Sequence, residues 1–447
     1  MRLVFTYEHS VPLSPFPIPS NNQLTMTPIN KITTTLLPLL LLPLLLTSPI
    51  SSKPTSSSHL LPPITRNGTT LLLSGKPWKA VGPNIYWLGL DENIPTPDSP
   101  NPPYNPSYPA KERVREAMAV INALGGTMVR AHTLGVSTGN PSSIWPDRQE
   151  TNEEAFESVD WAVYQAGLFG VRVLVPLVDN YDYYHGGKYD FLRWSGYNLT
   201  QEHDGENPDI QKFYTDDEAV GLFKEYVETV LTHRNKYTNL TYAEDPTIFA
   251  YETGNELQGP IWGDKACPST WTRTIAQHIR SLAPDKLIFD GTYGINTAHL
   301  DIEEIDVYSD HFYPLDVKRL RRGIEEVRNA GKVYFAGEYD WVGLDGGDGL
   351  EEFFDVLESE GEGVAGDAFW SLFGRDGVGC ETFVDHDDGF TLRYGNPDNS
   401  AYTNSRIKLI RRHFIAMSQG RDVGVNATLP VVSCPAPSPG DGIRRGY

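Results

Sequence analysis

The sequence predicts a single (β/α)8 (TIM) barrel, of the α/β fold class, on three observations. The first is length, since 447 residues suit one large barrel with long loops. The second is the alternation of short β-like apolar runs with longer stretches of helical periodicity, repeated about eight times. The third is that several of these runs are apolar throughout, which is typical of parallel strands covered on both faces.

The predicted elements alternate as strand and helix from residue 78 onward, with only a short connection after the fifth strand. The strands are expected at residues 78–85, 127–130, 171–178, 247–252, 287–290, 307–310, 333–336 and 366–372. The helices are expected at residues 111–124, 153–168, 216–233, 269–282, 316–330, 350–360 and 404–418. An open doubly wound sheet would also alternate. Such a sheet usually places a Gly-rich phosphate-binding turn after its first strand, and VGPNIYWLG at 81–89 is not one.

The N-terminal region predicts secretion. An apolar run, TTTLLPLLLLPLLL, extends from Thr33 to Leu46 between Lys31 and the small, polar SPISS, which is the three-part form of a signal peptide. A membrane anchor is the alternative, but a span needs about 20 apolar residues and this run is shorter and holds Pro38 and Pro43. We therefore expect an extracellular protein that is free of the membrane once the signal is removed.

This interpretation divides the chain into four parts. Residues 1–50 form the signal region, and an internal start at Met26 would give it a conventional N-terminus. Residues 51–67 form a Ser/Pro-rich lead-in, residues 68–418 the barrel domain, and residues 419–447 a Pro/Gly-rich tail that is expected to pack loosely.

Cysteines and glycosylation sequons agree with secretion. The acceptor sequons begin at Asn67, Asn198, Asn239 and Asn426. Cys267, Cys380 and Cys434 allow one disulfide in any of three pairings, and they lack the paired spacing of a zinc site.

The charge of the chain limits its partners. A formal net charge of -21 argues against nucleic acid and anionic membrane surfaces, because phosphate binding needs clustered Lys and Arg. A neutral, hydroxyl-rich ligand such as a polysaccharide fits better, and we expect a monomer without a cofactor. His132, His185, His311 and Asp310 are scattered over separate loops and do not indicate a metal site.

Polar residues at the predicted strand ends suggest the chemistry. In a barrel of this kind, active groups lie at the C-terminal ends of the strands. Glu256 after the fourth strand and Glu338 on the seventh would therefore face each other. Two close carboxyl groups, one protonated and one ionised, are what acetal hydrolysis requires. Arg130 and Tyr313 are suited to hold one carboxylate ionised, and Trp370 offers a flat face for a sugar ring.

Five motifs in order along the chain resemble the strand-end motifs of glycoside hydrolase family 5. They are VRAHT at 129–133, TGNEL at 253–257, SDHFYP at 309–314, FAGEYDW at 335–341 and FWSLF at 369–373. The resemblance implies a retaining mechanism with Glu256 as general acid/base and Glu338 as nucleophile. It also implies substrate-binding roles for a further set of residues: Asn255 on the sugar 2-hydroxyl, Arg130 and Tyr313 orienting Glu338, and His311 and Trp370 lining the same subsite. We add Trp87 and Tyr86 as candidate sugar platforms.

The substrate is expected to be β-mannan. The stretch VDNYDYYHGGKYDFLRWSG at 178–196 is similar to the third-strand loop of the family's fungal and plant endo-β-1,4-mannanases. Two departures from the family pattern, Asn-Glu-Leu for Asn-Glu-Pro and Tyr-Asp-Trp after the nucleophile, leave the subfamily open. An exo-β-mannosidase, a β-glucanase or cellulase, a transglycosylase and a non-catalytic carbohydrate-binding barrel are the alternatives. Glu252 is expected to be structural, paired with a basic residue of the barrel.

Overall fold

The computed structural model describes residues 61–93, 106–199, 207–259, 267–377 and 379–439. The predicted signal region, 1–50, lies outside these residues. Among the helices that are described, none combines the length and the apolar character that a membrane span requires.

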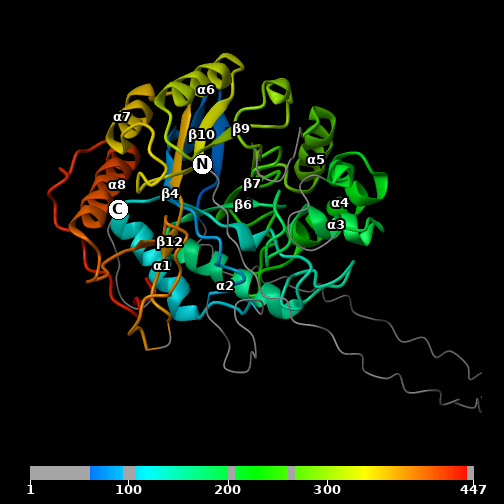
Figure 1. The fold of residues 1–447 in the computed structure, drawn as a ribbon, viewed down its shortest axis with the longest axis horizontal. Helices are drawn as coiled ribbons and strands as arrows, with labels where there is room; N and C mark the ends of the chain where they lie inside the picture. The colour runs from blue at the N-terminus through cyan, green and yellow to red at the C-terminus, as the bar shows by residue number, and fades with distance from the viewer. Residues whose placement is uncertain (1–60, 94–105, 200–206, 260–266, 378, 440–447) are drawn as a thin grey trace, which may run out of the picture. The chain divides into compact units, whose positions relative to one another are not determined.

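Eight parallel strands form the predicted barrel, and helices lie around them (Figure 1). The strands are β4 (Ala80–Pro83), β5 (Met128–Arg130), β6 (Arg172–Pro176), β7 (Ile248–Glu252), β8 (Leu287–Asp290), β9 (Val307–Phe312), β10 (Val333–Tyr339) and β11 (Val364–Phe369). Their order is β4-β11-β10-β9-β8-β7-β6-β5, and a parallel bridge between Asn84 and Arg130 joins β4 to β5. The predicted fold class is confirmed.

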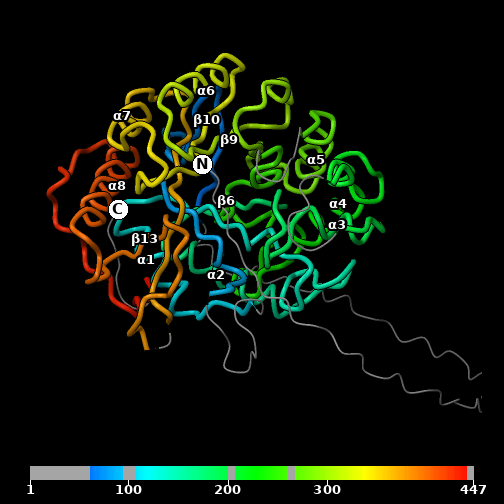
Figure 2. Tube along the Cα trace, in the orientation of Figure 1, coloured from blue at the N-terminus to red at the C-terminus, as the bar shows by residue number. Residues whose placement is uncertain are grey.

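The helices occupy the predicted places between the strands, except that the short helix at 188–194 was not predicted. They are α1 (Lys111–Leu124), α2 (Glu153–Phe169), α3 (Lys188–Trp194), α4 (Asp217–Thr232), α5 (Ser269–Leu282), α6 (Val317–Asn329), α7 (Leu350–Glu360) and α8 (Ala401–Gln419). In the part of the chain that the structure describes, three 3-10 helices add to them: η1 (His132–Leu134), η2 (Pro208–Tyr214) and η4 (Thr297–His299). As expected, β8 is followed only by a short segment with η4. The last helix, α8, lies beside the first, α1 (Figure 2).

Aromatic side chains fill the interior of the barrel. Phe249 on β7, Phe289 on β8 and Phe335 on β10 meet edge to face, with ring centroids 5.9 and 5.5 Å apart. Edge-to-face packing of this kind adds about 0.5–1.5 kcal/mol per pair beyond the burial of the rings. This part of the barrel interior is therefore a packed apolar core.

A small antiparallel sheet at the N-terminus was not predicted. It contains β1 (Ile64–Asn67), β2 (Thr70–Leu73) and β3 (Lys76–Pro77), so β1 falls within the expected lead-in, 51–67. Ile64 and Leu71 from this sheet are buried in the same cluster as Phe249. Strands of two to four residues carry too little alternation to be recognised in a sequence, which is why the ordered part begins before the expected residue 68.

The C-terminal tail is held by a disulfide between Cys380 and Cys434, whereas Cys267 is buried elsewhere in the fold. Cys380 lies in the segment that joins β12 (Leu372–Phe373) to β13 (Leu392–Arg393), a pair of short parallel strands. Ala436 is also buried, so part of the tail expected to be loose is attached to the barrel.

Replacing Cys434 with Ser should lower the free energy of unfolding by about 2–4 kcal/mol, because the bond closes a long loop in the unfolded chain. Urea denaturation with and without a thiol reductant measures this. The reductant should bring the wild type to the level of Cys434→Ser and leave the variant unchanged. Equal sensitivity of both proteins to the reductant would contradict the pairing.

Candidate active site

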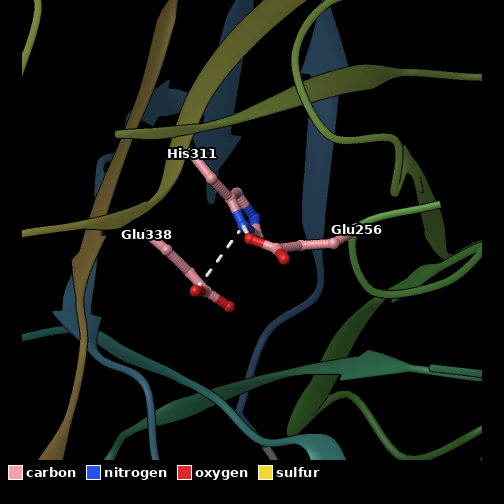
Figure 3. A group of neighbouring side chains, drawn as sticks. All are labelled: Glu256, His311 and Glu338. Carbon is pink, nitrogen blue, oxygen red and sulfur yellow. Dashed lines mark hydrogen bonds and ion pairs between the residues drawn. The ribbon is translucent and has the colours of Figure 1, made fainter. Parts of the chain in front are cut away.

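Glu256 and Glu338 project into one site from the ends of β7 and β10, which are separated in the sheet by β8 and β9 (Figure 3). Glu338 lies on β10, and Glu256 follows β7 in a sharply turned segment. Glu256 and Gln258 have φ angles of 53° and 60°, in the left-handed region that residues other than glycine rarely adopt. Such conformations cost about 1–3 kcal/mol each and occur most often at functional sites.

The carboxyl group of Glu338 is held by a cation and a hydroxyl group. Arg130 Nη1 donates to Oε1 at 2.8 Å, and the hydroxyl of Tyr313 donates to Oε2 at 3.1 Å. His132 Nε2 lies 3.7 Å from Oε1. Glu338 is only 5% exposed, so these donors replace water as its hydrogen-bond partners.

The carboxyl group of Glu256 has a different environment. Its Oε1 is 2.6 Å from His311 Nδ1, and its Oε2 accepts from the Tyr181 hydroxyl at 2.5 Å. The same His311 Nδ1 lies 3.5 Å from Glu338 Oε2, so the imidazole is shared between the two carboxyl groups (Figure 3). Glu256 has no arginine among these partners, which distinguishes it from Glu338.

Arg130 connects the site to the barrel core. Its Nε donates to Glu252 Oε2 at 2.7 Å, and its Nη2 donates to Asn255 Oδ1 at 2.8 Å. Arg130 and Glu252 have no exposed side-chain surface. The expectation that Glu252 pairs with a basic residue of the barrel is met, because its partner is Arg130.

Burial and neighbouring charge set the pKa values of the pair. Burial and the charge of Glu256 raise the pKa of Glu338 well above its usual value, although Arg130 and Tyr313 oppose this. Burial also acts to raise the pKa of Glu256, but contact with a protonated His311 lowers it. Burial lowers the pKa of His311 itself to about 4. Above that pH the imidazole is neutral, so its positive charge no longer lowers the pKa of Glu256, and each of the two buried carboxyl groups makes the other harder to ionise.

The site could accommodate a cation only in competition with these bonds. One ligand atom from each of Glu256, His311 and Glu338 lies within 4.8 Å of the others. A divalent metal could bridge such a set. The guanidinium of Arg130 already lies 2.8 Å from Glu338, and its charge disfavours a second cation.

An aromatic wall lies beside the pair. Trp370 stacks on Tyr86, with centroids 5.6 Å apart and planes 11° apart, and it meets His132 edge-on at 5.4 Å. Its Nε1 donates to Asp388 Oδ2 at 2.8 Å. Trp370 is partly exposed, so part of its ring is available to a ligand, whereas Tyr86 is buried.

The expectation that Trp87 is a sugar platform is wrong. Its ring has no exposed surface and is covered on one face by the guanidinium of Arg113, 3.6 Å from the ring centroid. Its Nε1 donates to the carbonyl of Leu372 at 3.0 Å. Trp87 therefore belongs to the core, and the apolar character of NIYWLG did not reveal which of its aromatic residues faces inward.

Three residues of the site were not identified from the sequence. Tyr181 bonds to Glu256, Asp388 bonds to Trp370, and Asn84 accepts from Arg130 Nη1 at 3.1 Å. Asn84 also donates to the carbonyl of Gly337, next to Glu338, at 2.8 Å. Asn84 could have been identified from the sequence, because it directly follows the first barrel strand. Tyr181 could not, because the sequence does not distinguish it from the other tyrosines in its loop.

Comparison with known proteins identifies the family of the chain. A family profile described as "GH family 5 beta-mannosidase-like" matches residues 63–313. The chain is 27% identical over 398 residues to mannan endo-1,4-beta-mannosidase 8 of Oryza sativa subsp. japonica, covering 78% of this chain and 97% of the relative.

Solved structures share the fold. The endo-1,4-beta-mannanase from Rhizomucor miehei matches with a TM-score of 0.62 at 22% identity, over 80% of this chain and 99% of that one. A glycoside hydrolase family 5 mannosidase from the same organism matches with a TM-score of 0.60 at 17% identity, over 82% of this chain and 100% of that one. Because the family profile spans more than half of the sequence, the chain belongs to glycoside hydrolase family 5, in its β-mannosidase-like group.

Proposed function

We propose that the protein is a secreted, retaining endo-β-1,4-mannanase in which Glu256 is the general acid/base and Glu338 the nucleophile. The observation that carries the proposal is the pair itself. Two buried carboxyl groups face each other at the C-terminal ends of β7 and β10, where barrel enzymes place their catalytic groups.

The separation of the carboxyl groups supports retention of anomeric configuration. An oxygen of Glu256 and an oxygen of Glu338 lie within 4.8 Å. Retaining glycosidases hold their carboxyl groups about 5–5.5 Å apart, whereas inverting enzymes need about 6.5–9.5 Å to admit a water molecule. The short separation leaves room for direct attack by one carboxylate.

The surroundings favour a proton on Glu256 and a negative charge on Glu338. Arg130 remains charged at every relevant pH and donates directly to Glu338. Among the described residues, the carboxyl group of Glu256 forms hydrogen bonds with the Tyr181 hydroxyl and with His311, which is neutral above pH about 4. A protonated Glu256 carries no negative charge, so it no longer raises the pKa of Glu338. Arg130 and Tyr313 then keep Glu338 ionised.

The reaction follows from this distribution of charge. Glu338 attacks the anomeric carbon while the glycosidic C–O bond breaks, and Glu256 gives its proton to the leaving oxygen. Water then attacks the glycosyl ester and returns a proton to Glu256, which frees Glu338. Asn255 binds the 2-hydroxyl, and Trp370 stacks on the sugar ring.

The substrate assignment rests on the named relatives. The rice protein is called a mannan endo-1,4-beta-mannosidase, and the chain covers nearly all of it. An exo-β-mannosidase is the second candidate, because the matching family profile is described as β-mannosidase-like. Products from β-mannan distinguish the two: oligosaccharides indicate internal cleavage, and mannose alone indicates attack at a chain end. Cellulose and β-1,3-glucan serve as comparison substrates.

Secretion is proposed on three features. The run from Thr33 to Leu46 has the form of a signal peptide, and the Cys380–Cys434 disulfide suits an oxidising compartment. The asparagines of the acceptor sequons are all exposed, at Asn67, Asn198, Asn239 and Asn426. Glycan attachment and a monomeric state remain predictions.

Replacing Glu338 with Ala should reduce kcat on β-mannan by more than about 10⁴-fold, because the nucleophile is lost. Glu381→Ala is the matched control, since Glu381 is an exposed glutamate in the segment after β11. It should retain wild-type activity. A Glu338→Ala variant that folds normally and keeps substantial turnover would show that another group is the nucleophile.

Replacing Glu256 with Ala should reduce the rate on mannooligosaccharides by about 10²–10⁴-fold, because their leaving oxygen needs a proton. A 2,4-dinitrophenyl β-mannoside, whose leaving group needs no proton, should still form the glycosyl enzyme. Azide should accelerate turnover and yield the β-mannosyl azide, identified by NMR. A loss that is equal for both substrates would contradict the role of Glu256.

A further inference from the structure

A third buried carboxyl group, that of Asp179, contacts the site without touching either glutamate of the pair. Asp179 follows β6 and is 1% exposed. Its Oδ1 accepts from Asn255 Nδ2 at 3.2 Å and from the backbone N–H of Tyr181 at 3.1 Å. Asn255 precedes Glu256 in the chain, and Tyr181 donates to Glu256. The carboxyl group of Asp179 is therefore connected to Glu256 in two ways, through Asn255 and through Tyr181.

The first route fixes the amide of Asn255. Arg130 can only donate, so the amide oxygen of Asn255 must face Arg130 Nη2, at 2.8 Å. The amide nitrogen then faces Asp179, and one of its two hydrogens is used there. A main-chain bond from Asn255 N–H to the Val178 carbonyl at 2.7 Å holds the two segments together. The second amide hydrogen is the one that a sugar hydroxyl would accept.

The second route fixes Tyr181. Asp179 accepts from the main chain of Tyr181, and the hydroxyl at the other end of that side chain donates to Glu256 Oε2 at 2.5 Å. The ring of Tyr181 is 4% exposed, so it is enclosed along its length. Removing the Asp179 carboxyl would release the turn on which this hydroxyl depends.

The carboxyl group of Asp179 is neutral below pH about 7, and its surroundings fit that form. His185 Nδ1 lies 3.2 Å from the carbonyl of Gly186, which only accepts, so that nitrogen carries the proton. Burial lowers the pKa of His185 to about 4, so its Nε2 holds a lone pair, 3.6 Å from Asp179 Oδ2. Burial also raises the pKa of Asp179 to about 7. Below that pH Asp179 is protonated, so no buried negative charge lies beside the lone pair of His185 Nε2.

We propose that Asp179 is a positioning residue that orients Asn255 directly and Glu256 through Tyr181, an inference that rests on the function proposed above. It does not touch the reacting atoms. Its contribution is the placement of the proton donor, and a misplacement of about 1 Å can cost about 10²-fold in rate.

The test compares Asp179→Ala, Asp179→Asn, Tyr181→Phe and the Asp179→Ala/Tyr181→Phe double variant on two substrates. One is mannopentaose, which needs the acid, and the other is 2,4-dinitrophenyl β-mannoside, which does not. Asp179→Ala should lower kcat/KM for mannopentaose by about 10–100-fold. The loss should be smaller for the activated substrate, because that substrate uses Asn255 but needs no proton donor. Asp179→Asn should recover most of this loss, because its amide oxygen still accepts and its nitrogen can donate to His185.

The double variant decides whether the two residues act together. If Asp179 acts through Tyr181, the double variant should be no slower on mannopentaose than the slower single variant. Losses that add up in the double variant would overturn the inference, and so would an Asp179→Ala loss that is equal on both substrates. A failure of Asp179→Asn to recover activity, with an unchanged melting temperature, would overturn it as well. A wild type inactive on both substrates would overturn the proposed function and this inference with it. An active wild type with an unimpaired Asp179→Ala variant would overturn this inference alone.

Discussion

The buried guanidinium of Arg130 is the group on which the rest of the site depends. It donates to Glu252 in the barrel interior, to Glu338 on β10 and to Asn255 beside Glu256. A buried cation requires such partners, because an unpaired charge in the core would cost several kcal/mol. The same ion pairs that stabilise Arg130 therefore fix the distance between the segments that carry the two glutamates. Arginine suits this position because its planar fork serves several acceptors at once.

The difference between the two glutamates follows from what surrounds each of them. Both are nearly buried, so each depends on its neighbours for the stability of its charged form. Glu338 has Arg130 and Tyr313, whereas Glu256 has Tyr181 and a histidine that is neutral above pH about 4. Two chemically identical side chains can thereby serve as nucleophile and acid within one site. Asn84 supports this arrangement, because it accepts from Arg130 and donates to the carbonyl of Gly337, next to Glu338.

Sequence reasoning reached the barrel and its strand ends because those signals are local. A run such as IFAYE, which becomes β7, is recognisable by itself, and the residues after it then fall at one end of the barrel. Family membership and the fold class were predicted correctly. Trp87 was misjudged because the sequence does not show that Arg113, on the following helix, covers its ring. Tyr181 was missed because its contact with Glu256 depends on a loop conformation that only the folded chain defines.

The most direct test of the account is to trap the glycosyl enzyme. The protein is incubated with 2,4-dinitrophenyl 2-deoxy-2-fluoro-β-mannoside, whose fluorine slows the second step so that the ester persists. Peptide mass spectrometry then locates the added sugar. The account predicts one fluoromannosyl group per chain, attached to Glu338. A label on Glu256 or elsewhere, or turnover of natural substrate with inversion and no trapped ester, would contradict it.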